Sequence, residues 1–144
     1  MNPNLPLNEP QERHITTILA HLEKAVADLR NSIGTPPAQL TLTHYEDPLP
    51  ATLNKTAGPV IGELEAALAR IARELGLPTT QASILRRHLA GLQLLSIDLG
   101  TVLPDSGLRG YGQVALATAH YLEEQIPRVE TLVRELVQML ERGG

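Results

Sequence analysis

The residues of this sequence best suited to chemistry are its histidines, and their spacing forms no recognisable catalytic set. His14, His21 and Asp28 recur at seven-residue steps, so on a helix they form one polar edge. Successive members lie about 10 Å apart along the helix axis, which is too far for one shared metal ion. The chain also lacks the Glu-x-x-His pair of di-iron bundles. We expect no metal and no cofactor, and we treat His14 and His21 as separate candidate ligand-binding residues.

His88 is a third candidate, because a helical wheel places it between Leu95 and Leu99 on an apolar face. The run His88-Leu89-Ala90-Gly91 loosely resembles the histidine-phosphotransfer helical domains, in which a lysine and then a glycine follow the histidine. Here Ala90 stands where a basic residue is needed nearby, and Gly91 comes one position early. The favoured interpretation is a neutral histidine hydrogen-bonded in the core.

A glycine-rich connection, residues 104–112, is expected to lead directly into the last helix. Free backbone N–H groups at a helix N-terminus favour an anion, so Arg109 and Gly110 are candidate ligand-binding residues. The connection matches neither the Walker lysine pattern nor the dinucleotide glycine spacing. Glycines that simply cap helices are the favoured interpretation.

Four arginines form a candidate basic patch around a tight hairpin expected at Leu77-Pro78. They are Arg70, Arg73, Arg86 and Arg87. Such a patch suits an acidic partner or a nucleic acid, whereas a solvated face with an Arg70–Glu74 pair is the favoured alternative. The net charge of −4, with three Tyr and no Phe or Trp, argues against nucleic acid as a partner.

The length of 144 residues and the absence of cysteine suggest one domain in a reducing compartment. The first six residues have neither a basic segment nor an apolar core, and the most apolar later run is broken by polar residues. We therefore expect a cytoplasmic protein that does not span a membrane, with residues 1–9 as a disordered tail.

Apolar residues at helical spacing predict four helices over about 10–32, 58–75, 79–101 and 112–142. Thr79 or Thr80 is the expected N-cap of the third. The apolar stripe of the fourth passes through Pro127 without changing phase, so we expect one long, kinked helix. The prediction is an all-α four-helix bundle over residues 1–144, with a long Pro-rich loop at 34–57 between the first two helices.

Several apolar residues point away from the expected core and indicate a partner. Leu94 and Ile97 lie off the main face of the third helix, and four residues broaden the stripe of the fourth. These four are Leu132, Leu136, Met139 and Leu140. The long loop or a second copy of the chain is expected to cover them.

The favoured function is a non-enzymatic interaction or assembly module, homodimeric through its third and fourth helices or paired with another helical protein. Two alternatives remain open at this point. One is a small-ligand-binding or enzymatic bundle whose pocket near His88 is gated by loop 34–57. The other is a regulator that binds an acidic partner or a nucleic acid through the arginine patch.

Overall fold

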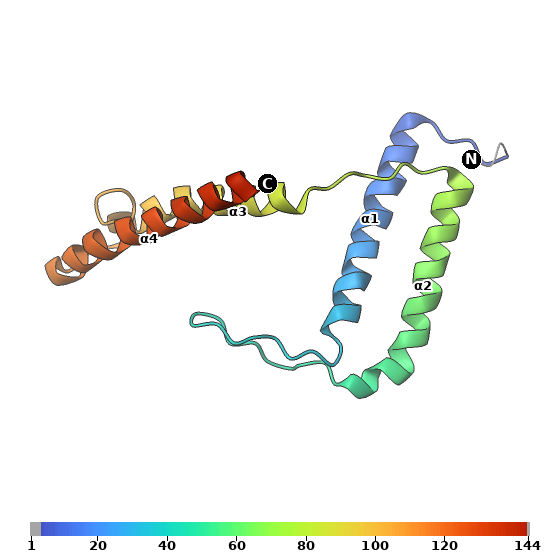
Figure 1. The fold of residues 1–144 in the computed structure, drawn as a ribbon, viewed down its shortest axis with the longest axis horizontal. Helices are drawn as coiled ribbons and strands as arrows, with labels where there is room; N and C mark the ends of the chain where they lie inside the picture. Colours follow the sequence, from blue (N-terminus) through green and yellow to red (C-terminus); the bar gives the residue numbers. More distant parts are fainter. Residues whose placement is uncertain (1–3, 144) are drawn as a thin grey trace. The chain divides into compact units, whose positions relative to one another are not determined.

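The computed structural model describes residues 4–143. These residues form four α-helices and three 3₁₀ turns, with no strand (Figure 1). The helices are α1 (Glu9–Ser32), α2 (Asn54–Leu75), α3 (Ile84–Leu99) and α4 (Leu116–Gly143). The chain divides into two compact units, Met1–Thr80 and Gln81–Gly144. Each unit holds one pair of helices in contact, α1 with α2 and α3 with α4. The prediction of an all-α protein with four helices is confirmed.

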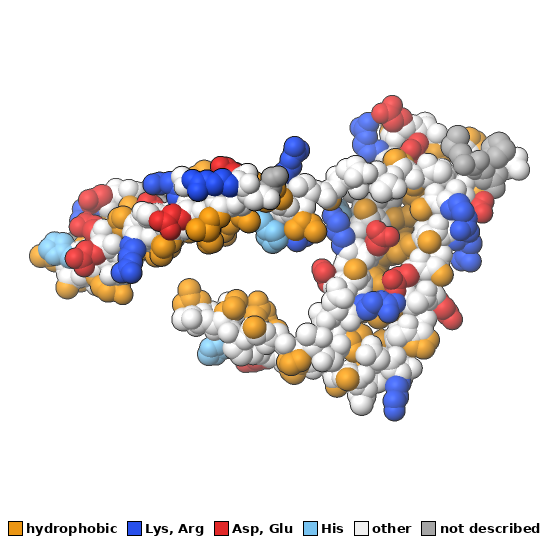
Figure 2. All heavy atoms as spheres, in the orientation of Figure 1, with side chains coloured by type: hydrophobic (Ala, Val, Ile, Leu, Met, Phe, Trp, Pro, Cys, Tyr) orange, Lys and Arg blue, Asp and Glu red, His pale blue; other side chains and the backbone are white. Residues whose placement is uncertain are grey.

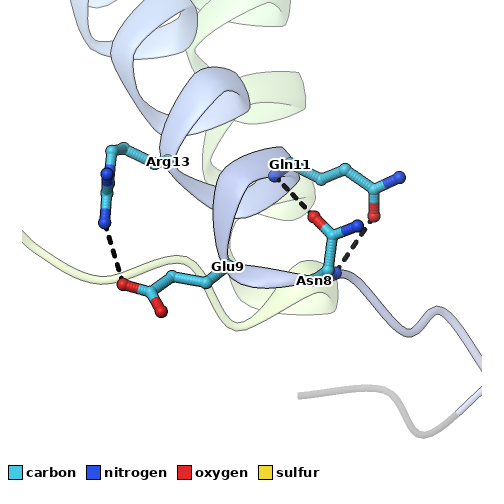
Figure 3. Close-up of polar contacts among 4 residues, drawn as sticks. All are labelled: Asn8, Glu9, Gln11 and Arg13. Atoms are coloured by element: carbon cyan, nitrogen blue, oxygen red, sulfur yellow. Dashed lines mark hydrogen bonds and ion pairs between the residues drawn. The ribbon is translucent and has the colours of Figure 1, made fainter.

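Helix α1 begins at a capping box. The Asn8 side chain accepts a hydrogen bond from the Gln11 backbone N–H at 2.9 Å, and the Gln11 side chain accepts one from the Asn8 N–H at 3.0 Å (Figure 3). One turn on, Arg13 pairs with Glu9 at 2.8 Å. The helix therefore begins at Glu9, inside the segment predicted to be a disordered tail. Residues 1–3 of that segment lie outside the described residues.

The core of the first unit lies between α1 and α2. Val26 and Ile33 pack with Ile61 in one buried cluster, and Leu68 is buried further along α2. Arg30 of α1 forms an ion pair with Glu65 of α2 beside this cluster. These contacts place residue 30 level with residue 65 and residue 33 level with residue 61, so the two helices run antiparallel.

The long loop between α1 and α2 is present, as predicted, over residues 33–50. Its two ends meet where the Gly34 N–H donates to the Leu49 carbonyl at 2.8 Å, and the φ of 75° at Gly34 suits glycine. Leu49 and Leu53 pack against the buried cluster of the first unit. A 3₁₀ turn, Ala51–Leu53, continues into α2, which consequently begins at Asn54 rather than near Gly58.

The prediction of a tight hairpin between the second and third helices is wrong. Gly76 ends α2 in the left-handed conformation, with the Leu77 N–H donating to the Ala72 carbonyl at 2.9 Å. Residues 77–83 then run without secondary structure. Ser83, not Thr79 or Thr80, caps α3, because its hydroxyl accepts a hydrogen bond from the Arg86 N–H at 3.1 Å.

The second unit is a hairpin of α3 and α4. A 3₁₀ turn at Gly100–Val102 contacts α4, and a second turn, Leu108–Tyr111, lies in the connection. Helix α4 is continuous through Pro127, as predicted, and the Thr131 hydroxyl donates to the Pro127 carbonyl at 3.0 Å. Ala119 and Pro104 are the buried side chains among the described residues of this unit. The hairpin therefore encloses very little core.

Candidate interaction surface

Helices α3 and α4 contact one another through a single stripe on each helix. On α3 the half-buried positions recur every three or four residues: Leu85, Leu89, Leu92, Ser96 and Leu99. On α4 the corresponding positions are the buried Ala119 and the half-buried Leu122, Ile126, Glu130, Val133, Val137 and Leu140. This spacing is that of two helices packed along a common seam.

A second, exposed apolar stripe runs beside the contact stripe on each helix. Its members on α3 are Ile84 and Leu95, which are 71% and 60% exposed. Its members on α4 are Val129, Leu132, Leu136 and Met139, which are between 40% and 61% exposed. Each of these six residues comes directly before a half-buried residue in the sequence. Both exposed stripes are therefore rotated from the seam by about 100° in the same sense.

This shared rotation places both stripes on one side of the hairpin. In a pair of antiparallel right-handed helices, the residue that comes one position before a contact residue lies on the same side of the pair in both helices. We call this side the α3–α4 apolar face, defined by the six residues above. Figure 2 shows hydrophobic side chains gathered along the lower edge of this hairpin in that view. The face has contributions from both helices, as an interface between helix pairs requires.

The prediction that His88 is buried is wrong, for a physical reason that also applies to Ile84 and Leu95. These two residues are among the most exposed apolar residues of α3. His88, expected to be buried, is exposed and precedes the half-buried Leu89, so it lies within the α3–α4 apolar face. A helix that packs on one neighbour buries only a narrow stripe, and residues one step aside remain open to solvent.

The residues predicted to contact a partner fall into three groups. Leu132, Leu136 and Met139 belong to the α3–α4 apolar face. Leu140 is half-buried, in step with the contact stripe of α4. Leu94 and Ile97 are 62% and 73% exposed and lie on the side of α3 turned away from α4. Ile84, Leu95 and Val129 also lie in the α3–α4 apolar face but were not among the residues predicted to contact a partner.

The predicted anion site at the start of the last helix does not form. Helix α4 begins at Leu116, so residues 113–115 separate it from the glycine-rich connection. Arg109 instead pairs with Asp105 at 3.0 Å, and Gly110 lies in the 3₁₀ turn with its N–H donating to the Gly107 carbonyl. The donors expected to bind an anion are thus used within the connection itself.

The four arginines of the predicted basic patch are divided between the two units. Arg70 and Arg73 lie on α2 in the first unit, whereas Arg86 and Arg87 lie in the first turn of α3 in the second. All four are exposed. The tight turn that was expected to gather them is replaced by the unstructured residues 77–83.

The cleft found in the first unit does not include either candidate histidine of α1. A shallow cleft of about 310 Å³ in the first unit is lined by the first turns of α1 and by the segment after α2. Its lining residues are Glu9, Glu12, Arg13, Thr16, Thr17, Pro78 and Thr80. His14 and His21 are exposed on α1 and line no part of it.

Residues 4–143 contain no group of three acidic or histidine side chains placed to hold a metal ion. In the same range, every helix is too short or too polar to cross a membrane. No protein-family model, curated protein or solved structure matches this chain.

Proposed function

We propose that this protein is an assembly module that forms a homodimer through the α3–α4 apolar face. The observation that carries the proposal is the pair of exposed stripes on one side of a hairpin that encloses almost no core. Two helices bury only one seam between them, whereas two such hairpins packed face to face make a four-helix bundle with a central core. A second copy presents the same face and is the simplest partner.

The energy of this contact is of the same size as the cost of association. Six apolar side chains per copy remain about half exposed in the face. Burying the exposed half of one such side chain is worth about 1 kcal/mol, so twelve side chains give about 12 kcal/mol. Association costs about 4 to 15 kcal/mol in lost freedom. We therefore expect a dimer that forms reversibly and depends on protein concentration.

Charges at the margins of the face favour one arrangement of the two copies. Asp98 on α3 and Arg128 on α4 lie at opposite edges, both exposed, and neither makes an ion pair with another described residue. When Leu85, the first residue of the α3 stripe, is set level with Leu140, the last residue of the α4 stripe, Leu99 is level with Ile126. In this register Asp98 is close to the level of Arg128. If a two-fold axis parallel to the helices relates the two copies, α3 of one copy packs against α4 of the other. Each Asp98 then meets Arg128 of the second copy.

The experiment is to replace Leu136 by glutamate and measure the mass in solution by light scattering. Leu136→Glu introduces a charge into the centre of the face, and burying it unpaired is costly, so we expect the dissociation constant to rise at least about 100-fold. The matched control is Leu116→Glu, because Leu116 is 72% exposed at the start of the same helix but off the face. An unchanged mass for Leu136→Glu would contradict the proposal.

A further inference from the structure

His88 occupies the position on α3 that points toward the middle of the proposed dimer. It comes three residues after Leu85 and four before Leu92, both in the contact stripe, so it is rotated only about 60° from the seam toward the face. In a four-helix bundle the two neighbours of a helix lie about 90° apart, so the central axis falls about 45° from the seam. His88 therefore faces the axis of the dimer, although it is exposed in a single chain.

The layer of the dimer that surrounds His88 is apolar. In the register that sets Leu85 level with Leu140, His88 is level with Val137. On α4, the residues within one turn of that level that belong to the seam or the face are Val133, Leu136, Val137, Met139 and Leu140. The two-fold axis places His88 of the second copy at the same level on the opposite side of the axis. Two imidazoles thus share one apolar layer.

The charged side chains nearest to this layer are turned away from it. Five lie within one turn of the level of His88, and all are exposed: Arg86 and Arg87 on α3, and Arg134, Glu135 and Glu141 on α4. On the helical wheels, Arg87 and Glu135 point away from the seam, and the other three lie on the side of the seam opposite the α3–α4 apolar face. None of the five is placed to pair with an imidazole at the axis.

The remaining carboxylates of the hairpin that border the seam or the face lie at other levels. Glu130, half-buried in the contact stripe of α4, is about 10 Å farther along the helix axis, and Asp98, at the margin of the face, is about 15 Å away along α3. The 3₁₀ turn Gly100–Val102, which also contacts α3, has no titratable side chain. A proton on His88 therefore brings a charge that no carboxylate in the same layer of the described hairpin neutralises.

Protonation of His88 changes what this layer can hold. A neutral imidazole has one N–H donor and one acceptor nitrogen, so two of them across the axis complement each other. Two imidazolium ions have donors only, repel each other and bring two charges into an apolar layer, which is costly. The free chain therefore binds protons more tightly than the dimer does. It follows that the affinity of the dimer is full above about pH 7 and falls as the pH drops below about 6.

We propose that protonation of His88 dissociates the dimer, so that pH regulates assembly through the α3–α4 apolar face. This inference rests on the proposed homodimer and adds its regulation. Between about pH 5.5 and 8 the side chains that change charge are the histidines. Of the others, His14, His21 and His44 belong to the first unit, and His120 follows the buried Ala119, on the side of the seam opposite the face.

The test measures the dissociation constant of the full chain by sedimentation at about pH 8 and at about pH 5.5. For the wild type we expect it to rise at least about tenfold at the lower pH. His88→Gln replaces the imidazole by an amide that does not titrate, so its two values should agree within about twofold. The matched control is His120→Gln, which should keep the response of the wild type. Circular dichroism checks that the helices persist at both pH values.

The outcomes separate the switch from the dimer itself. A wild-type dimer with the same dissociation constant at both pH values overturns the switch and leaves the dimer in place. A monomer at both pH values, with helices intact, overturns the proposed dimer. A pH response that persists in His88→Gln, or that disappears in His120→Gln, contradicts the assignment of the switch to His88.

Discussion

Leu136 and Val137 are neighbours in sequence but have different surroundings on α4. Val137 is half-buried in the seam with α3, whereas Leu136 is 50% exposed on the adjoining face. The same relationship holds for Leu95 and Ser96 on α3, with the more apolar residue outside. A solvent-facing leucine beside a half-buried valine is a costly use of apolar surface for an isolated hairpin. A partner that covers Leu136 removes this cost.

The arrangement of the two copies is testable by charge reversal. Asp98→Arg places like charges opposite each other at both symmetric pairs of the proposed dimer. At about 0.2–1 kcal/mol for each exposed pair, the dissociation constant should rise about two- to 30-fold. Combining it with Arg128→Asp should restore the original affinity. Analytical ultracentrifugation of the wild type, both single variants and the double variant gives the comparison.

A different rescue would contradict this arrangement. If Arg87→Asp, rather than Arg128→Asp, compensates for Asp98→Arg, then α3 of one copy lies on α3 of the other. High salt should reduce all of these effects, because exposed charge pairs are screened.

The sequence predicts the helices well because each carries its own signals. Pro10 and the capping residues around it mark the start of α1, and the αL glycine at Gly76 marks the end of α2. The phase of the apolar residues also predicts correctly that α4 continues through Pro127. These features depend on residues within a few positions of one another.

The predictions that fail depend on which helices contact each other. Leu95 and His88 are on the apolar side of α3, and a sequence pattern does not distinguish a core position from an exposed one beside a narrow seam. The expected turn at Leu77-Pro78 fails because Ser83, four residues after Thr79, provides a cap directly before the first apolar residue of α3. The sequence predicts part of the α3–α4 apolar face, through Leu132, Leu136 and Met139, because their stripe is too broad for one seam.

His88 is the one ionisable side chain enclosed by the α3–α4 apolar face, and its replacement tests whether the face becomes buried. His88→Leu exchanges an imidazole for an aliphatic side chain in both copies. We expect the dimer to tighten about 30-fold, because the two additional buried leucines contribute about 1 kcal/mol each, or about 2 kcal/mol together. A dissociation constant that does not change, measured by sedimentation, would show that this position stays in solvent.

Leu94 provides the contrast between the two exposed sides of α3. Because it points away from α4, Leu94→Glu should leave the dimer within about twofold of its original affinity and leave helicity intact. If the Leu94→Glu variant loses the dimer while the Leu136→Glu variant keeps it, the interface lies instead on the side of α3 that also carries Ile97.

The capping box of α1 has a measurable effect on stability. Asn8→Ala removes the acceptor for the Gln11 N–H, and the expected loss is about 1 kcal/mol in the free energy of unfolding. Asn8→Gly should lower the free energy of unfolding by only a few tenths of a kcal/mol. Urea unfolding followed by circular dichroism measures both values, and equal stabilities for wild type and Asn8→Ala would contradict the role given to the cap.

The most direct test of the central claim is the mass of the unmodified protein in solution, measured by light scattering over a concentration series. The proposed assembly predicts a mass of twice the 15.6 kDa chain, which decreases on dilution. A mass of one chain at every concentration would contradict self-association through the α3–α4 apolar face.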